Sequence, residues 1–220
     1  MSIHNPADAY GVAPKSSSLA GPIGGSVLFW RTKRLADIVI SLCLLPVVGL
    51  VAGALLVLNR GFNQGPLLYH QTRMGQGLTA FTAIKFRSMQ PVPAITRAVD
   101  DPIETDRITP LGRILRKTRL DELPQVINVL RGEMSLIGPR PDYFDHAREY
   151  LTQIPEYRLR HLVRPGISGL AQVTLGYAEG LDATRAKATA DLAYIRNASF
   201  ALELRIFWLT LVTVLLRRGA

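Results

Sequence analysis

Two adjacent carboxylates, Asp121 and Glu122, lie in the most unusual local pattern of the sequence, the segment RKTRLDELPQ. Three cations come immediately before them, namely Arg116, Lys117 and Arg119. Cationic neighbours keep carboxylates ionised, and an ionised carboxylate can attack phosphorus or hold a divalent metal whose other ligands are phosphate oxygens. The same pattern also fits an ordinary helix start, with Asp121 as the N-cap and Glu122 complementing the helix dipole.

Further cations stand at predicted turns and strand ends elsewhere in the chain. They are Lys85 and Arg87 in KFRSM, Arg140 in GPRP and Arg164 in RPG. Each alone would be an ordinary solvated surface charge. Together with Arg116 and the acid pair they indicate a pocket for a diphosphate, because guanidinium groups bind phosphate oxygens through a rigid fork.

Other chemistry lacks a signature in the sequence. The four histidines do not have the spacing of a zinc site. A single cysteine, Cys43, excludes both a disulfide scaffold and a zinc site built on cysteines. There is no phosphate-binding P-loop and no nucleophile elbow, and Gly75-Gln76-Gly77 lacks the strand–GxGxxG–helix context of a dinucleotide-binding fold.

Composition narrows the class of partner without choosing one. The 26 Lys and Arg residues exceed the 17 Asp and Glu residues and give a net charge of +9. This excess is compatible with nucleic acid, an anionic membrane or a phosphorylated substrate. Aromatic residues make up only 7% of the chain, which argues against a protein that stacks single-stranded bases.

An apolar run precedes the candidate site in the chain. Residues 38–58 contain no charge and would span about 30 Å as a helix, enough to cross the hydrocarbon core of a membrane. Pro46 lies inside the run, and basic residues flank both of its ends. A kinked spanning helix and a re-entrant helix–break–helix both fit this pattern. Residues 1–29, rich in Ser and Gly, predict a flexible tail.

The remaining 160 residues predict the elements that carry the site. Residues 67–89 read as a β-hairpin that turns at Gly75-Gln76-Gly77. A helix follows from Ile108, and a second one starts near Asp121 and ends at Gly132. MSLIGPRP predicts a short strand, RPGISGLAQV a turn followed by a strand, and residues 202–216 an interfacial or packed helix.

The order of these motifs closely resembles the bacterial sugar transferase family, the small monotopic polyprenyl-phosphate phosphoglycosyl transferases. The matching segments are KRLADIVIS, the apolar run with Pro46, RMGQG, KFRSM, DPIETDRITPLGRILRKTRLDELPQVINVLRGEMSLIGPRP, RPGISGLAQV and DLAYIRNASFALELRI. The resemblance covers about residues 30–216, and its long central block is highly specific.

The resemblance implies a reaction and a set of site residues. Family members transfer a phosphosugar from a UDP-sugar to undecaprenyl phosphate and release UMP, the first membrane step of exopolysaccharide or glycoconjugate synthesis. By position, Asp121 would be the nucleophile that forms a phosphosugar–aspartate intermediate, and Glu122 would bind Mg²⁺. The matching substrate-binding candidates are Arg116, Lys85, Arg87, Arg140, Arg164 and Gln172.

The resemblance also implies an architecture and a location. The expected fold is α+β and mainly helical: a flexible tail over residues 1–29, a re-entrant membrane helix over 30–60 broken at Pro46, and a cytosolic transferase domain over 61–220. That domain would contain the short hairpin and an interfacial C-terminal helix. The protein would lie on the cytoplasmic face of the bacterial inner membrane. Membrane lipid is an expected partner and nucleic acid is not, while a homodimer is compatible with the resemblance.

Three positions depart from the family's pattern. Leu45 stands before Pro46 where the family usually has Ser, Arg119 where it commonly has Ser, and Ala171 where it often has Trp. The first affects the geometry of the membrane break, and the other two affect substrate fit. Two other functions compete with the transferase: a non-catalytic membrane-anchored basic adaptor that binds anionic lipid or nucleic acid, and a metal-dependent hydrolase of nucleotide-sugars.

Overall fold

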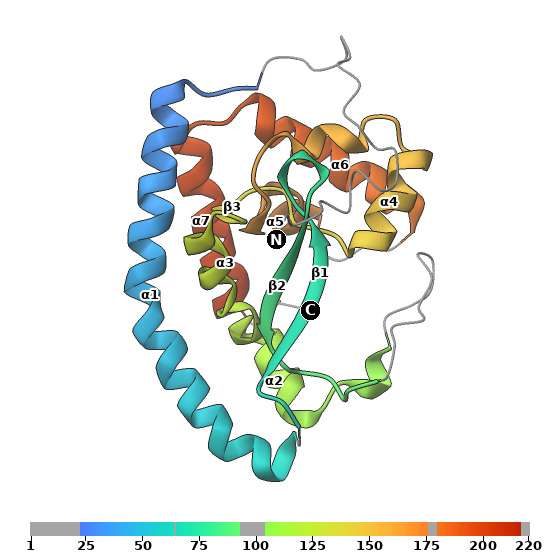
Figure 1. The fold of residues 1–220 in the computed structure, drawn as a ribbon. Helices are drawn as coiled ribbons and strands as arrows, with labels where there is room; N and C mark the ends of the chain where they lie inside the picture. Colours follow the sequence, from blue (N-terminus) through green and yellow to red (C-terminus); the bar gives the residue numbers. More distant parts are fainter. Residues whose placement is uncertain (1–22, 64, 93–103, 176–179, 217–220) are drawn as a thin grey trace, which may run out of the picture.

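The computed structural model describes residues 23–63, 65–92, 104–175 and 180–216. This part of the chain is mostly helical, with two small sheets and one long apolar helix near its N-terminus (Figure 1). The mainly helical fold that the sequence predicts is therefore confirmed. Most of the predicted tail, residues 1–22, lies outside the described residues.

The apolar run forms part of a single helix, α1 (Val27–Phe62), which bows around one side of the molecule (Figure 1). Its N-cap is Ser26, whose side chain accepts a hydrogen bond of 3.1 Å from the Phe29 amide. The helix continues through Pro46, where the family resemblance implies a break. One missing backbone donor is tolerated in an apolar helix when its neighbours remain paired, so proline here leaves the helix continuous.

The hairpin lies at residues 68–86. Strands β1 (Leu68–Met74) and β2 (Ala80–Phe86) pair antiparallel, with Tyr69 opposite Lys85. Their connection includes a 3₁₀ turn, η2 (Gln76–Leu78), in which Gly77 has a φ of 65° that favours glycine. Side chains alternate along a strand, so the β1 face beside Lys85 also carries Gln71 and Arg73.

The acid pair lies between two helices. A short 3₁₀ turn, η3 (Thr105–Arg107), precedes helix α2 (Pro110–Lys117), and the 3₁₀ turn η4 (Leu120–Glu122) and helix α3 (Gln125–Arg131) follow it. The sequence predicts a helix that starts near Asp121, and the structure places the start of α3 at Gln125, directly after the 3₁₀ turn that contains the acid pair. Arg119 adopts a left-handed φ of 55°, which ends α2 and turns the chain toward Asp121 and Glu122.

The second half of the chain covers the hairpin. Strands β3 (Ser135–Ile137) and β4 (Gly166–Ser168) form a parallel pair. The helices and turns around them are α4 (Phe144–Gln153), η5 (Tyr157–Leu162), α5 (Leu170–Leu175), α6 (Leu181–Arg196) and α7 (Phe200–Leu215). The strand predicted for GISGLAQV is correct only for its first three residues, and the rest forms α5. Gly169 lies between them, where an added Cβ would come within 2.2 Å of the Gly138 carbonyl oxygen.

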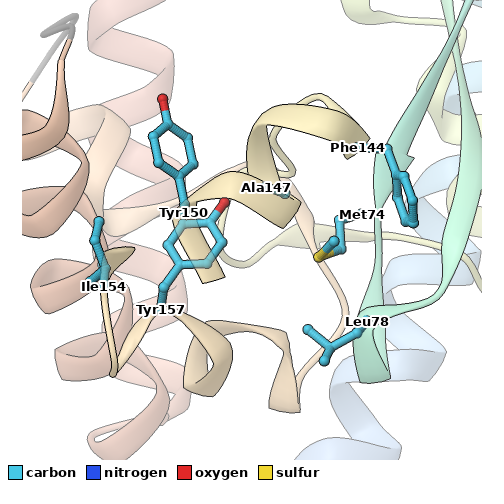
Figure 2. Close-up of a cluster of buried hydrophobic side chains, with 8 residues drawn as sticks. Met74, Leu78, Phe144, Ala147, Tyr150, Ile154 and Tyr157 are labelled. Atoms are coloured by element: carbon cyan, nitrogen blue, oxygen red, sulfur yellow. The ribbon is translucent and has the colours of Figure 1, made fainter. Parts of the chain in front are cut away.

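Hydrophobic clusters fix these elements around the hairpin. One joins the hairpin end to α4 and η5, and Figure 2 shows Met74 and Leu78 facing the side chains of Phe144, Ala147 and Tyr157. Another packs β3, η5, α6 and α7 around the fully buried Ile206. The loop after β3, which carries the GPRP motif, is thereby held between two parts of the core.

Candidate active site

Glu122 is held by cations from two other parts of the chain. Its Oε1 atom accepts a hydrogen bond of 2.9 Å from Lys85 Nζ on β2 and another from Arg140 Nη2 in the GPRP loop. Its Oε2 atom lies 3.2 Å from Arg140 Nη1 and 3.9 Å from Arg119 Nη1. Burial opposes ionisation, but Arg140 and Lys85 outweigh it and hold the pKa of Glu122 well below its usual range. Glu122 is therefore a fixed anion.

Asp121 has a different environment from its neighbour. Its residue is only 7% exposed, and its carboxylate forms no hydrogen bond or ion pair within the described residues. Burial raises the pKa of Asp121 to about 6, although Lys85 acts against the shift. A carboxylate that lacks partners retains all its lone pairs, so Asp121 is free to bind a metal or to attack an electrophile.

A small pocket lies beside the acid pair. Its lining residues are Arg73, Ala83, Lys85, Gln125, Arg140 and Pro141. Three of these are cations that come from β1, β2 and the GPRP loop. Burial lowers the pKa of Lys85 to about 8, despite the nearby Glu122. This depression has almost no internal volume, but the three cations on its walls would attract an anion.

Arg73 is a site residue that the sequence reasoning did not select. Its guanidinium donates to Gln71 Oε1 at 3.1 Å from Nε and 2.6 Å from Nη2, and to the Pro141 carbonyl at 2.5 Å from Nη1. These contacts direct the buried group toward the pocket. The sequence held one indication. Arg73 lies two residues after Gln71 and four after Tyr69, so on a strand it shares a face with Tyr69, the residue that pairs with Lys85.

Arg116 belongs to the site through its charge. It lies on the last turn of α2, and its positive charge lowers the pKa of Asp121. Its guanidinium contacts the Met89 sulfur at 3.6 Å. The structure therefore brings together four of the predicted cationic and acidic positions around Asp121: Glu122, Lys85, Arg116 and Arg140.

Three other predicted residues lie elsewhere. Arg87 is buried and donates to the backbone carbonyls of Pro66, at 2.8 Å, and Asn63. Arg164 donates to the Gly132 carbonyl at 2.9 Å, at the C-terminal end of α3. Gln172 lies on α5 with both amide atoms buried and without a partner in the described structure. The hydrogen bonds of Arg87 and Arg164 described above go to backbone carbonyls and not to the acid pair.

Comparison with known proteins identifies the family. The model of the family described as bacterial sugar transferase matches residues 28–217. The chain belongs to this family. The match contains the hairpin, the acid pair, the GPRP loop, nearly all of α1 and all of α7, so every candidate site residue described above lies within it.

Individual members of the sugar transferase family match most of the chain. The UDP-N-acetylgalactosamine-undecaprenyl-phosphate N-acetylgalactosaminephosphotransferase of Aeromonas hydrophila is 40% identical over 200 residues, 91% of this chain and 47% of that protein. A UDP-glucose:undecaprenyl-phosphate glucose-1-phosphate transferase of Caulobacter vibrioides is 42% identical over 158 residues, 70% of this chain and 58% of its own. The chain spans about half the length of these curated relatives.

A shorter relative matches over almost its whole length. The exopolysaccharide production protein PSS of Rhizobium leguminosarum is 38% identical over 191 residues, which are 84% of this chain and 96% of that protein. A relative of similar size therefore matches most of this chain.

Proposed function

We propose that this sugar transferase moves a phosphosugar from a UDP-sugar to undecaprenyl phosphate, with release of UMP, through an intermediate on Asp121. The observation that carries the proposal is the contrast within the acid pair. Glu122 is fixed and ionised by Lys85 and Arg140, whereas the buried Asp121 carboxylate beside it has no partner in the described structure. The proposed reaction agrees with the names of two relatives, which describe transferases for UDP-N-acetylgalactosamine and for UDP-glucose.

The charge of the site supports a diphosphate substrate. Five cations surround the acid pair: Arg73, Lys85, Arg116, Arg119 and Arg140. These five cations outnumber the two carboxylates of the pair, so the site carries an excess of positive charge. A UDP-sugar carries two negative charges on its diphosphate, so its binding would relieve the repulsion among the cations.

The proposed chemistry consists of two displacements at one phosphorus. A carboxylate oxygen of Asp121 attacks the phosphorus that carries the sugar, and the bond from that phosphorus to the bridging oxygen breaks, so UMP leaves with the electron pair. A phosphate oxygen of undecaprenyl phosphate then attacks the same phosphorus and releases the carboxylate. Lys85 and Arg140 are placed to stabilise charge on the transferring group. Two steps allow a soluble donor and a lipid acceptor to use one site in turn.

The acid pair suits Mg²⁺ when phosphate completes the coordination. Mg²⁺ is usually bound through one or two carboxylates together with substrate phosphates. Within the described residues no group of three or more potential side-chain ligands is present. Asp121 is unpartnered, and Glu122 Oε2 accepts only one hydrogen bond, at 3.2 Å, so both retain lone pairs for a metal. When bound, the ion would supply neutralisation of the leaving UMP.

The geometry of α1 supports a monotopic attachment to the cytoplasmic face of the bacterial inner membrane. Val27–Asn59 is long and apolar enough to cross a membrane, with only 11% of its most apolar window buried. Yet both arms of the helix contact one domain: Lys33 pairs with Glu203 at 2.7 Å, and Leu55 packs against Phe86 and Leu115. We infer that both ends lie on the same side, with the middle of the helix dipping into the bilayer.

The apolar face of α7 extends this membrane surface. Phe200, Leu204, Trp208 and Leu215 are exposed, and Phe200 packs edge-on against Phe29 of α1 at a ring-centroid distance of 4.9 Å. Trp side chains are enriched at membrane interfaces, where an amphipathic ring contacts both headgroups and chains. We therefore infer that α7 lies at the interface, where the phosphate of an undecaprenyl chain also lies.

The transferase, hydrolase and adaptor hypotheses predict different results in one experiment. Detergent-solubilised protein is incubated with Mg²⁺, undecaprenyl phosphate and a panel of UDP-sugars, and UMP release is measured beside Asp121→Asn. The transferase turns over only when lipid is present, releases no more than about one UMP per protein without it, and the variant releases none. Continued release over many turnovers without lipid, together with free sugar phosphate, would indicate the hydrolase. No release with any sugar, beside an active family member as control, would favour the adaptor.

A further inference from the structure

Behind the active-site pocket lies a buried ionic network centred on Arg160 of η5. The residue is 4% exposed, and Asp191 on α6, which faces it, is 1% exposed. Arg160 Nε donates to Asp191 Oδ2 at 3.0 Å, and Nη2 lies 2.7 Å from the same oxygen. Nη1 pairs with Asp142 Oδ2 and lies 3.1 Å from the Tyr157 hydroxyl. Tyr157 in turn donates to Asp142 at 2.5 Å, and its ring belongs to the cluster in Figure 2.

The last donor of this guanidinium reaches the active-site loop itself. Arg160 Nη2 donates to the backbone carbonyl of Arg140 at 2.8 Å. All five N–H groups of Arg160 therefore have an acceptor within hydrogen-bonding distance. Arg140 is held at its backbone by Arg160, while its side chain binds Glu122 at the other end.

We propose that Arg160 is a positioning residue, which fixes the backbone of Arg140 so that its guanidinium meets Glu122 and the substrate's phosphates. The contacts divide between the loop and the scaffold: Arg140 and Asp142 belong to the loop, whereas Asp191 and Tyr157 belong to helices packed in the core. Arg160 thus links the loop to α6 and fixes the loop's position relative to that helix. This role rests on the transferase activity proposed above.

Stability alone does not account for such a network. Replacing a buried ion pair by apolar residues of similar volume is often neutral or stabilising, because each buried charge carries a desolvation penalty. Burial raises the pKa of Asp191 to about 6, which shows that this penalty is present here. The arrangement does provide direction, since a planar guanidinium binds several acceptors at fixed angles and an ammonium does not.

A double-mutant cycle separates positioning from folding. Arg160→Lys keeps the charge but loses the fork, and Arg140→Gln removes the group that is positioned. In the wild-type background we expect Arg160→Lys to lower kcat/KM for UMP release on the order of tenfold to a hundredfold, as for a misplaced binding group. In the Arg140→Gln background the same change should lower it by less than about twofold, because the two residues act as one unit. Equal factors in both backgrounds would overturn the proposal.

Glu203→Gln is the matched control. It breaks another ion pair, between the buried Lys33 and the partly buried Glu203, and within the described residues Glu203 contacts Lys33 and Tyr194 and not the GPRP loop. Glu203→Gln should change kcat/KM by the same factor with and without Arg140→Gln. This holds even when the Glu203→Gln protein melts at as low a temperature as the Arg160→Lys protein. If Arg160→Lys does not fold, Tyr157→Phe replaces it, with a smaller loss and the same dependence on Arg140.

Hydrogen–deuterium exchange tests the positioning without turnover. In Arg160→Lys the amides of residues 138–143 should exchange faster than in wild type, whereas Glu203→Gln should leave them unchanged. An unchanged loop in the folded Arg160→Lys protein would refute the positioning role. If wild type releases no UMP with any sugar, the proposed function fails separately, and the exchange result still decides whether Arg160 holds the loop.

Discussion

Neutralising each of the two adjacent carboxylates should change the stability of the protein in opposite directions. Burial raises the pKa of Asp121 from 3.8 to about 6, so the folded protein holds this proton more tightly than the unfolded chain does. Its ionisation therefore costs stability as the pH rises from about 4 to about 6, and the cost remains at higher pH. Each pKa unit corresponds to about 1.4 kcal/mol, which gives a cost of about 3 kcal/mol at pH 7.5.

Asp121→Asn removes this cost while it abolishes turnover. For a chain of this size, a gain of about 3 kcal/mol corresponds to a rise in melting temperature of roughly 6–12 °C at pH 7.5. The gain should shrink toward zero near pH 4, where the wild-type carboxyl is already protonated in both states. Thermal melts of the detergent-solubilised protein across this pH range measure the effect.

Glu122→Gln is the control with the opposite sign. Its carboxylate is the partner of Lys85 and Arg140, so neutralising it leaves two buried cations without their counter-charge. We expect the melting temperature to fall at pH 7.5. If Asp121→Asn also lowered the melting temperature at this pH, or if its effect did not depend on pH, the assignment of Asp121 as an unpaired carboxylate whose burial costs stability would be refuted.

The remaining predictions concern pH and single cations. A plot of kcat/KM against pH should be bell-shaped, falling below about pH 6 as Asp121 gains a proton and above about pH 8 as Lys85 loses one; activity that stays flat between pH 5 and 9 would contradict this assignment. Arg73→Gln should raise KM for the UDP-sugar about tenfold or more, measured by initial rates, because a charged donor to the diphosphate is lost; an unchanged KM would remove Arg73 from the site. Arg87→Gln should lower the free energy of unfolding by about 1–3 kcal/mol in denaturant titrations, since two buried carbonyls lose their donor; wild-type stability would show that these bonds contribute nothing.

The sequence predicts the chemistry of the site better than it predicts which residue each cation contacts. Lys85 lies on β2 and Arg87 follows the end of that strand, two residues later, and the local sequence pattern does not distinguish them. One reaches Glu122 and the other reaches the segment after α1, because different elements pack against the two positions. Arg73 was overlooked for the same reason, since only the strand pairing and the GPRP loop bring it to the pocket.

Local structure was misjudged where backbone conformation depends on a single residue. The acid pair looked like a helix start because a cap residue and a first-turn acid have the same residue types. The left-handed conformation of Arg119, which has no sequence signal in a non-glycine residue, places the pair in a 3₁₀ turn instead. In α1 the single proline was compatible with both a kinked continuous helix and a break, and the structure has a continuous helix.

The central claim is that the phosphosugar passes through Asp121. The most direct test is intact-protein mass spectrometry after incubation with Mg²⁺ and a UDP-sugar that supports turnover, in the absence of undecaprenyl phosphate. The account predicts a burst of about one UMP per protein, a mass increase equal to one phosphosugar on residue 121, and loss of that mass when the lipid is added. An enzyme that turns over with lipid but never carries the added mass, and releases no UMP until both substrates are present, would contradict it.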